Sequence, residues 1–517
     1  MTPEPPGPPH GPDDGTVTSL GPAISDPSLS SSASTPLFGS DRLVRGGLLL
    51  LVGNVLTKLS SVTTTVVIVR QLSVTDFGRY SFAFAYGTFF ALFADLGLNA
   101  IATRNLATAE LDDGGRIVGS ALAVKGAIVL TCLVGSTAGL LLFRPGLRLA
   151  GLVAAVSVAN ALPGTISLVL VARLRMTFPV LIQVCGAVAI LVASIGVLAA
   201  HAGVVALVAV QATGTVAASV VLGSIARRRL PGRLYVDRET VGKLVRDATP
   251  LALSGLAVVV FRRADQLLLA RLASSRELAR YAAAVSVVEA LNVVPVAVAT
   301  VALPALAQRH SRLQPRPGGI SRISDIGYRI LGCFVLPLAA LGTVWGRPAM
   351  GLLYGPAYRV SGPALAVLLW AAFFGFIGVL LQQVLVARNQ LRELAILVVF
   401  GAALNVGLNL WAIPRYGGLG AAWASLIAYS VPFVIGSFVG AARGAFRECF
   451  RASLRPALAA GAILLVLLTA RPLGVIGALL FGVVAPAALL ITGSTRVTEL
   501  RAFARQLAAG RGARDAS

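Results

Sequence analysis

Length, composition and charge exclude most soluble classes of protein: of 517 residues, 56% are hydrophobic and 13% are charged, the mean hydropathy is +0.83 and the net charge is +23. Soluble domains carry about 25% charged residues, and a soluble chain this apolar would expose more hydrophobic surface than a monomer tolerates. The composition excludes a soluble enzyme, a disordered protein and a secreted disulfide scaffold, and it predicts an all-α polytopic membrane protein.

The first 40 residues differ in composition from the rest of the chain. Residues 1–40 are rich in Pro, Gly, Ser and Thr, with too few apolar side chains to offset the entropy of ordering. They also lack the charged start and short apolar core of a secretory signal peptide. We therefore expect a disordered cytoplasmic tail, with recruitment of a cytoplasmic partner as the alternative to an unconstrained extension.

Beyond this tail the chain is a series of apolar runs, each long enough to cross a bilayer, which takes about 20 residues. We predict about fourteen transmembrane helices. The predicted spans are 43–69, 80–103, 117–143, 147–172, 178–200, 203–226, 248–270, 280–306, 326–346, 361–386, 393–413, 418–441, 453–471 and 473–493. Only Arg471 and Pro472 separate the last two runs, so twelve or thirteen spans remain open.

The longest inner connection follows the sixth span and divides the chain into two six-helix lobes. The predicted organisation is an N-lobe at 41–226, a basic cytoplasmic linker at 227–246, a C-lobe at 247–442, a C-terminal helix pair at 443–495 and a cytoplasmic tail at 496–517. The lobes also echo each other in sequence. Arg70 precedes Arg79-Tyr80 by nine residues, and Arg271 precedes Arg280-Tyr281 by nine, at an offset of 201.

The positive charges predict the orientation in the membrane. With the N-terminus in the cytoplasm, 29 of the 44 Lys and Arg residues fall in cytoplasmic segments and 11 in outer loops. This bias is the positive-inside pattern of plasma-membrane proteins, and it predicts that both termini are cytoplasmic. The same placement explains the basic character without nucleic-acid binding, which the sequence does not favour.

Motifs of enzymes, cofactors and metals are missing. Four cysteines form no C-x-x-C pair and the three histidines lie far apart, so we expect no metal site. The chain has no P-loop and no Gly-x-Ser-x-Gly or His-Glu-x-x-His motif, and no outer loop is long enough for a glycosyltransferase site. We expect a transporter that is not an enzyme and needs no cofactor.

Four basic side chains lie inside predicted spans: Lys58, Lys125, Arg262 and Arg263. A charge within the bilayer is costly and marks a functional site by default. In a water-filled cavity these groups would bind phosphate or pyrophosphate through charge-assisted hydrogen bonds. Adjacent helical residues point about 100° apart, so one of Arg262 and Arg263 faces a cavity and the other a neighbouring helix. Lys125 can instead snorkel to the interface.

Three carboxylates accompany these cations within the predicted spans: Asp95, Asp265 and Glu289. They could bind a coupling cation or carry protons. The alternative for Asp265 and Glu289 is a structural ion pair with Arg262 or Arg263. For Asp95 the alternative is a contact that stabilises its own helix end.

Five segments resemble a known family. They are Val69-Arg70-Gln71-Leu72 with Asp76-Phe77-Gly78-Arg79-Tyr80, Asp95-Leu96-Gly97-Leu98 with Arg104, Pro250-Leu251 through Asp265-Gln266-Leu267-Leu268-Leu269, Leu353-Tyr354-Gly355-Pro356-Ala357-Tyr358, and Asn405 through Gly420-Ala421-Ala422. In this order they resemble the polysaccharide transporter branch of the multidrug/oligosaccharidyl-lipid/polysaccharide exporter superfamily. This sequence departs from the family pattern at Ser73, where the family has glycine. It departs again at Ala279, which takes in the second repeat the position that Gly78 has in the first.

The resemblance implies a flippase of the plasma membrane. Such proteins move polyprenyl-pyrophosphate-linked oligosaccharides to the outer leaflet for surface polysaccharide biosynthesis, by alternating access around a cationic cavity. It also implies a functional monomer that works beside a polysaccharide polymerase and glycosyltransferases, with coupling to Na⁺, H⁺ or the membrane potential. A lipid II flippase and a cation-coupled multidrug exporter of the same superfamily remain the alternatives. The exporter is expected to have a more acidic cavity.

Overall fold

The computed structural model describes residues 40–108, 113–172, 177–230, 232–299, 319–388, 390–438, 440 and 442–469. Every regular element in these segments is helical, which confirms the predicted all-α class. The expected N-terminal tail up to residue 39, the last span at 473–493 and the C-terminal tail lie outside the described residues.

Fourteen α-helices and three short 3₁₀ segments are described along these segments. They are α1 (Ser40–Gln71), α2 (Val74–Phe93), α3 (Leu98–Thr108), α4 (Gly114–Gly139), η1 (Leu140–Leu142), α5 (Pro145–Ala155), η2 (Val156–Asn160), α6 (Ala161–Ala172), α7 (Thr177–Ala199), α8 (Gly203–Arg228), α9 (Arg238–Leu272), α10 (Ser275–Leu291), α12 (Gly319–Tyr354), η3 (Pro356–Ser361), α13 (Gly362–Ala387), α14 (Leu391–Phe438) and α15 (Arg443–Thr469).

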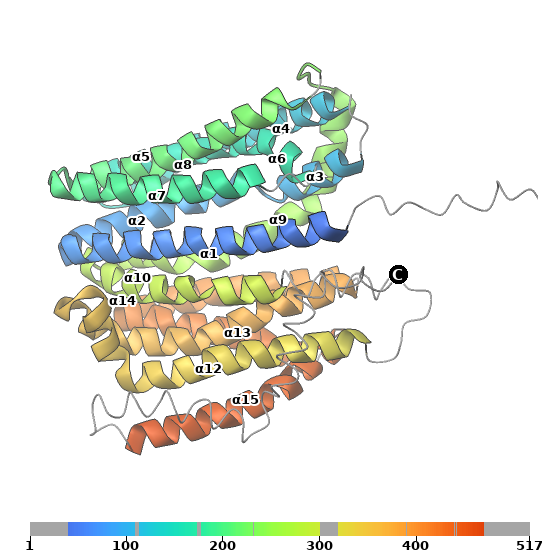
Figure 1. The fold of residues 1–517 in the computed structure, drawn as a ribbon. Coiled ribbons are helices and arrows are strands. Elements are labelled where there is room, and N and C mark those ends of the chain that lie inside the picture. Colours follow the sequence, from blue (N-terminus) through green and yellow to red (C-terminus); the bar gives the residue numbers. More distant parts are fainter. Residues whose placement is uncertain are drawn as a thin grey trace, which may run out of the picture.

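The long helices lie side by side in two bundles (Figure 1). Helices α1 to α8 form the N-terminal bundle, where α1 packs on α7, α7 on α8, and α2 on α5. Helices α10 to α15 form the C-terminal bundle, in which α12 packs on both α13 and α15. Helix α9 joins them, because it contacts α3 and α4 of the first bundle and α14 of the second.

The predicted internal repeat reappears as a repeated helix cap. The side chain of Ser73 accepts a hydrogen bond from the backbone N–H of Asp76 at the start of α2, and Ser274 does the same for Glu277 at the start of α10. Both carboxylates also pair with an arginine three residues further on. An N-cap oxygen accepts a hydrogen bond from a backbone N–H that has no partner within the helix. Helices α2 and α10, at the corresponding positions of the two repeats, therefore begin with the same type of cap.

The predicted linker 227–246 is helical at both ends. Helix α8 continues to Arg228, and α9 begins at Arg238 because the Asp237 side chain accepts a hydrogen bond of 2.9 Å from the backbone N–H of Thr240. Hydrogen bonds from the Thr240 side chain and backbone also hold the pKa of Asp237 below its usual range. The backbone N–H of Asp237 donates to Ser120 of α4, which ties the linker to the N-terminal bundle.

The two bundles meet where α2 and α10 begin. The Arg70 guanidinium donates to the carbonyl oxygens of Leu353 at 2.9 Å and Leu352 at 2.5 Å, near the C-terminal end of α12. A cation is favoured at this end of a helix, where carbonyls lack intrahelical partners. Beside this contact Gly78 of α2 lies directly on the backbone of Ser275, so that α2 and α10 approach closely.

Ten described helices are long and apolar enough to cross a membrane, or eleven when the bent pair α2–α3 is one span. This confirms a polytopic membrane protein but not the predicted count of fourteen. Helix α9, which carries Arg262, Arg263 and Asp265, is not among these spans. Helix α14 is counted once although Gly417 breaks it with φ 57° and ψ −136°. At 1.5 Å per residue a straight helix of its length would span far more than a bilayer of about 30 Å.

Replacement of Gly78 by alanine is expected to destabilise the contact between the bundles. The new Cβ would overlap the Ser275 backbone, which cannot move as a side chain would, so α2 and α10 must separate. We expect a loss of about 1–3 kcal/mol in the free energy of unfolding, read as a lower melting temperature of the purified protein. Gly126→Ala in α4 is the control, because nothing lies within 4 Å of the position that its new Cβ would take; equal melting temperatures would contradict the close approach.

Candidate functional site

A cavity of about 510 Å³ lies between the two bundles. Its walls come from α1, α2, η2, α7 and α8 on one side and from α9, α10 and α12 on the other. Residues 200 or more positions apart in sequence therefore face one space, which is the arrangement expected of parallel repeats around a shared substrate site.

The charged residues of this cavity are Lys58 of α1, Arg263 of α9 and Glu289 of α10. The Arg263 and Glu289 side chains form an ion pair at 2.9 Å, with the arginine buried and the carboxylate partly exposed. The Arg263 guanidinium also lies 5.8 Å from the centre of the Phe84 ring of α2. Lys58 lies within electrostatic reach of both members of the pair. The cavity thus holds two cations and one anion.

One hydrogen-bond donor of Arg263 is unsatisfied in the described part of the chain. Its Nε is buried and has no hydrogen-bond partner in the described part of the chain. A buried unsatisfied donor costs about 1–3 kcal/mol, and more when the group is charged. A guanidinium presents several donors in a planar fork, which suits phosphate oxygens.

The N-terminal bundle contributes a neutral polar wall to the same cavity. Three amides, Asn160, Gln183 and Gln211, line it together with the hydroxyls of Thr57, Ser61, Thr64, Thr65, Tyr80, Ser81, Thr215 and Ser219. Amides and hydroxyls both donate and accept hydrogen bonds. This wall can therefore satisfy a hydroxyl-rich ligand without adding charge. This wall was not predicted from the sequence, although isolated Asn and Gln residues lie within the apolar spans 147–172, 178–200 and 203–226.

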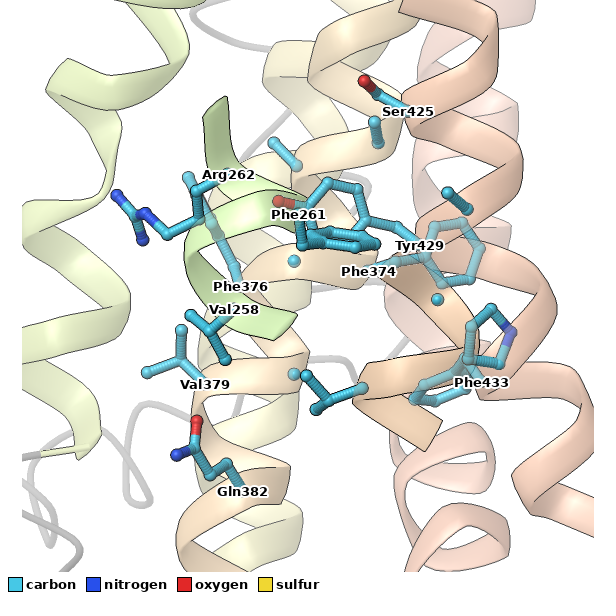
Figure 2. Close-up of a pocket in the computed structure, with 18 of the residues that line it drawn as sticks. Val258, Phe261, Arg262, Phe374, Phe376, Val379, Gln382, Ser425, Tyr429 and Phe433 are labelled. Carbon is cyan, nitrogen blue, oxygen red and sulfur yellow. The ribbon is translucent and has the colours of Figure 1, made fainter. Parts of the chain in front are cut away.

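Arg262 does not face this cavity. It lies at the edge of a second pocket of about 310 Å³ inside the C-terminal bundle, formed by α9, α10, α13 and α14. Figure 2 shows its guanidinium directed away from the rings of Phe261, Phe374 and Tyr429. The expected divergence of Arg262 and Arg263 is therefore present in the structure, since the two arginines line different spaces.

Asp265 lies in the same second pocket and is buried. Its carboxylate accepts hydrogen bonds from the Tyr281 hydroxyl at 2.5 Å and from the Gln266 backbone N–H at 2.7 Å. Ser425 of α14 lies 3.5 Å from the same tyrosine hydroxyl. These contacts join α9, α10 and α14. Asp265 therefore accepts hydrogen bonds from neutral groups, whereas Glu289 forms the ion pair with Arg263.

Lys125 and Asp95 lie apart from both pockets. The Lys125 ammonium, 1% exposed, donates to Asp95 at 3.2 Å and to Asn99 at 2.6 Å, and so joins α4 to the break between α2 and α3. The break has Leu96 at φ 37° and Gly97 at φ 76°. This contact lies between two helices, whereas the structural alternative for Asp95 was a contact within its own helix end, and Lys125 does not line the central cavity.

The fold and the cavity define a multi-pass membrane protein with two helical lobes around a shared, basic and polar space. Residues 43–310 match the model of a family described as "Polysaccharide biosynthesis protein". Because this match covers more than half of the chain, the protein belongs to that family. The sequence motifs had indicated the same relationship, which the match confirms.

Solved structures of transporters share this fold. The lipid II flippase MurJ in an inward closed conformation is 13% identical over 86% of this chain and 98% of its own, with a TM-score of 0.68. An inward-facing MATE family multidrug resistance transporter is 17% identical over 80% of this chain and 99% of its own, with a TM-score of 0.57. A MOP superfamily transporter from Pyrococcus furiosus is 13% identical over 82% and 96%, with a TM-score of 0.52. No curated protein sequence matches this chain.

Replacement of Asp95 by asparagine is expected to destabilise the protein, because it leaves the buried Lys125 ammonium without its counter-charge. The expected loss is about 2–4 kcal/mol in the free energy of unfolding. This is less than for a fully buried ion pair, because Asp95 is partly exposed. The Asp95→Asn/Lys125→Met double variant should recover much of this loss in a double-mutant cycle of thermal or denaturant unfolding. Additive losses would contradict the pairing.

Proposed function

We propose that this protein is a flippase that moves polyprenyl-pyrophosphate-linked oligosaccharide from the cytoplasmic to the outer leaflet for surface polysaccharide biosynthesis. The observation that carries this proposal is the pairing of a basic group with a neutral polar wall in one cavity between two lobes. Membership of the polysaccharide biosynthesis family and the MOP fold support it.

Each part of the cavity suits one part of such a substrate. Lys58 and Arg263 would bind the pyrophosphate, the lysine as a mobile point charge and the arginine through its planar fork. The amides and hydroxyls of α7, α8 and η2 would hydrogen-bond the sugars. A substrate anion would compete with Glu289 for Arg263, so headgroup binding would loosen an ion pair between α9 and α10. Rearrangement of these helices is how binding would bias the two lobes between inward and outward access.

Orientation and coupling belong to the same proposal. We place both termini in the cytoplasm on the basis of the positive-inside bias, with the protein in the plasma membrane as a monomer. Movement would be driven by Na⁺, H⁺ or the membrane potential without a bound cofactor, with Glu289 and Asp265 as the carboxylates available for coupling. A polysaccharide polymerase and glycosyltransferases would be the functional partners.

A multidrug exporter is the second candidate, and the charges in the cavity argue against it. An exporter of organic cations needs carboxylates free to attract them, whereas Glu289 is held by Arg263 at 2.9 Å and Lys58 adds a further positive charge. A lipid II flippase would share the pyrophosphate-binding chemistry, and the identity of the accumulated precursor distinguishes it.

Lys58→Ala and Arg263→Ala are each expected to reduce transport in proteoliposomes by about 10- to 100-fold, because each removes a charge-assisted hydrogen bond of about 1.5–3 kcal/mol. Transport is measured as polyprenyl-linked sugar that becomes accessible on the far leaflet. Lys243→Ala is the matched control, since that lysine is exposed on α9 and pairs with Glu239 away from the cavity. Wild-type rates in both cavity variants, at equal protein abundance, would remove the cavity assignment.

Depletion of the protein in cells is expected to trap polyprenyl-linked oligosaccharide on the cytoplasmic side of the membrane and to reduce surface polysaccharide. The measurement is the amount of each lipid-linked precursor in each leaflet. Accumulated cell-wall precursor in place of polysaccharide precursor would indicate a lipid II flippase. Unchanged precursors with greater sensitivity to cationic compounds would overturn the proposed function.

A further inference from the structure

Helices α7 and α8 form a further pocket beside the central cavity, distinct from the one inside the C-terminal bundle. It is a groove of about 440 Å³ whose lining is apolar apart from Cys185 and Thr213. All of its walls come from these two helices. They are also the least buried of the described spans, with 11% and 17% of their apolar segments inside the protein.

The groove and the central cavity share a wall. Gly186, Ile190 and Ala218 line both spaces. Between them α7 and α8 meet at Gly186, Gly214 and Ala218, with the Ile190 side chain seated on Gly214. A Cβ added at Gly186 would lie 3.2 Å from the Cβ of Ala218, and one added at Gly214 would lie 2.6 Å from the Cγ1 and 4.0 Å from the Cβ of Ile190. We call these four residues, Gly186, Ile190, Gly214 and Ala218, the α7–α8 seam.

Polarity changes abruptly across the seam. Gln183 of α7 and Gln211 of α8 face the cavity, whereas Ile182 and Val210, one position earlier on each helix, line the groove. A step of one residue rotates a side chain by about 100° around a helix. Each helix therefore turns a hydrogen-bonding face to the cavity and an apolar face to the groove, and only the seam separates the two.

We propose that the α7–α8 seam is a lateral gate and that the groove outside it holds the isoprenoid chain of the lipid-linked substrate. This inference rests on the proposed function. A long hydrocarbon attached to a pyrophosphate has to leave the polar cavity, and the groove is an apolar space that shares a wall with that cavity. The pocket inside the C-terminal bundle also borders the cavity, at Val285 and Glu289, but its lining includes Arg262, Asp265 and Gln382, which suit a hydrocarbon less well. Ordinary phospholipid chains are the competing occupant.

The seam has the chemistry of a contact that can open. Gly186, Gly214 and Ala218 have no side chain or only a methyl group, so Ile190 is the one larger side chain in the seam. Small residues let helices approach closely, and movement of the Ile190 side chain away from Gly214 would join the cavity to the groove. The described structure shows no salt bridge between these helices.

A disulfide across the seam tests the gate. The double variant Ile190→Cys/Gly214→Cys has a Cβ–Cβ distance of 4.0 Å, within the range of about 3.5–4.5 Å that a disulfide requires. In a background with the four native cysteines replaced by alanine, oxidation is expected to abolish transport and reduction to restore it. Gly53→Cys/Val180→Cys is the matched control, because it ties α7 to α1 without bridging the seam; its Cβ–Cβ distance of 3.3 Å lies just below that range, so formation of the bond is first checked by loss of free thiols. This lock should leave transport intact.

Undiminished transport by the oxidised Ile190→Cys/Gly214→Cys protein would overturn the gate. Transport lost equally in both oxidised double variants would also overturn it, since the effect would not be specific to the seam. Retention of pyrophosphate binding by the locked protein separates a blocked gate from a damaged cavity. If the reduced protein moves no polyprenyl-linked sugar at all, the proposed function itself fails.

The native Cys185 thiol reports on the occupant of the groove. It is exposed and lines the groove, whereas Cys132 and Cys449 are buried. Undecaprenyl pyrophosphate at about ten times its dissociation constant is expected to slow maleimide labelling of Cys185 roughly tenfold. Geranyl pyrophosphate, with the same headgroup and a chain too short to fill the groove, should not. Equal protection by the same concentration of phosphatidylglycerol would overturn the isoprenoid assignment.

Discussion

The ion pair between Arg263 and Glu289 is the interaction on which the rest of the structure depends. A guanidinium inside a membrane protein must be paired or face water, and this one is paired, beside a cavity at the junction of the two lobes. Helix α9 carries Arg262, Arg263 and Asp265 and lies between the bundles, in contact with α2, α4 and α14. The ion pair and the cavity therefore accommodate charges of α9 where the lobes meet.

The charges inside the bundles divide into two kinds with different consequences. Lys125 and Asp95 satisfy each other beside a break in the second span and hold helices together. Lys58 and Arg263 face a shared space, and Arg263 has an unsatisfied donor. An intramembrane charge whose hydrogen bonds are complete stabilises the fold, whereas one left incomplete in a cavity is available to a ligand. This distinction separates the proposed headgroup site from the structural pair.

Polar and apolar surfaces are placed so that one substrate can occupy both. The cavity joins a basic region to a wall of amides and hydroxyls, and the groove beside it is apolar. A lipid-linked oligosaccharide combines a pyrophosphate, sugars and a hydrocarbon chain, which are three chemistries that no single environment accommodates. The α7–α8 seam is where two of these environments meet, and it is one residue layer thick because Gly186, Ile190 and Ala218 line both spaces.

The sequence by itself determined the all-α class, the polytopic membrane character, most of the span positions, the repeat at Arg79-Tyr80 and Arg280-Tyr281, and the family. These depend on hydropathy, charge and short motifs, which are local properties of the chain. Tertiary structure alone decided that Arg263 faces the cavity while Arg262 does not, that Lys125 is a structural cation, and that Gln183 and Gln211 share a wall. The partners of a buried charge lie on other helices, and helix rotation follows from packing rather than from the composition of any one span.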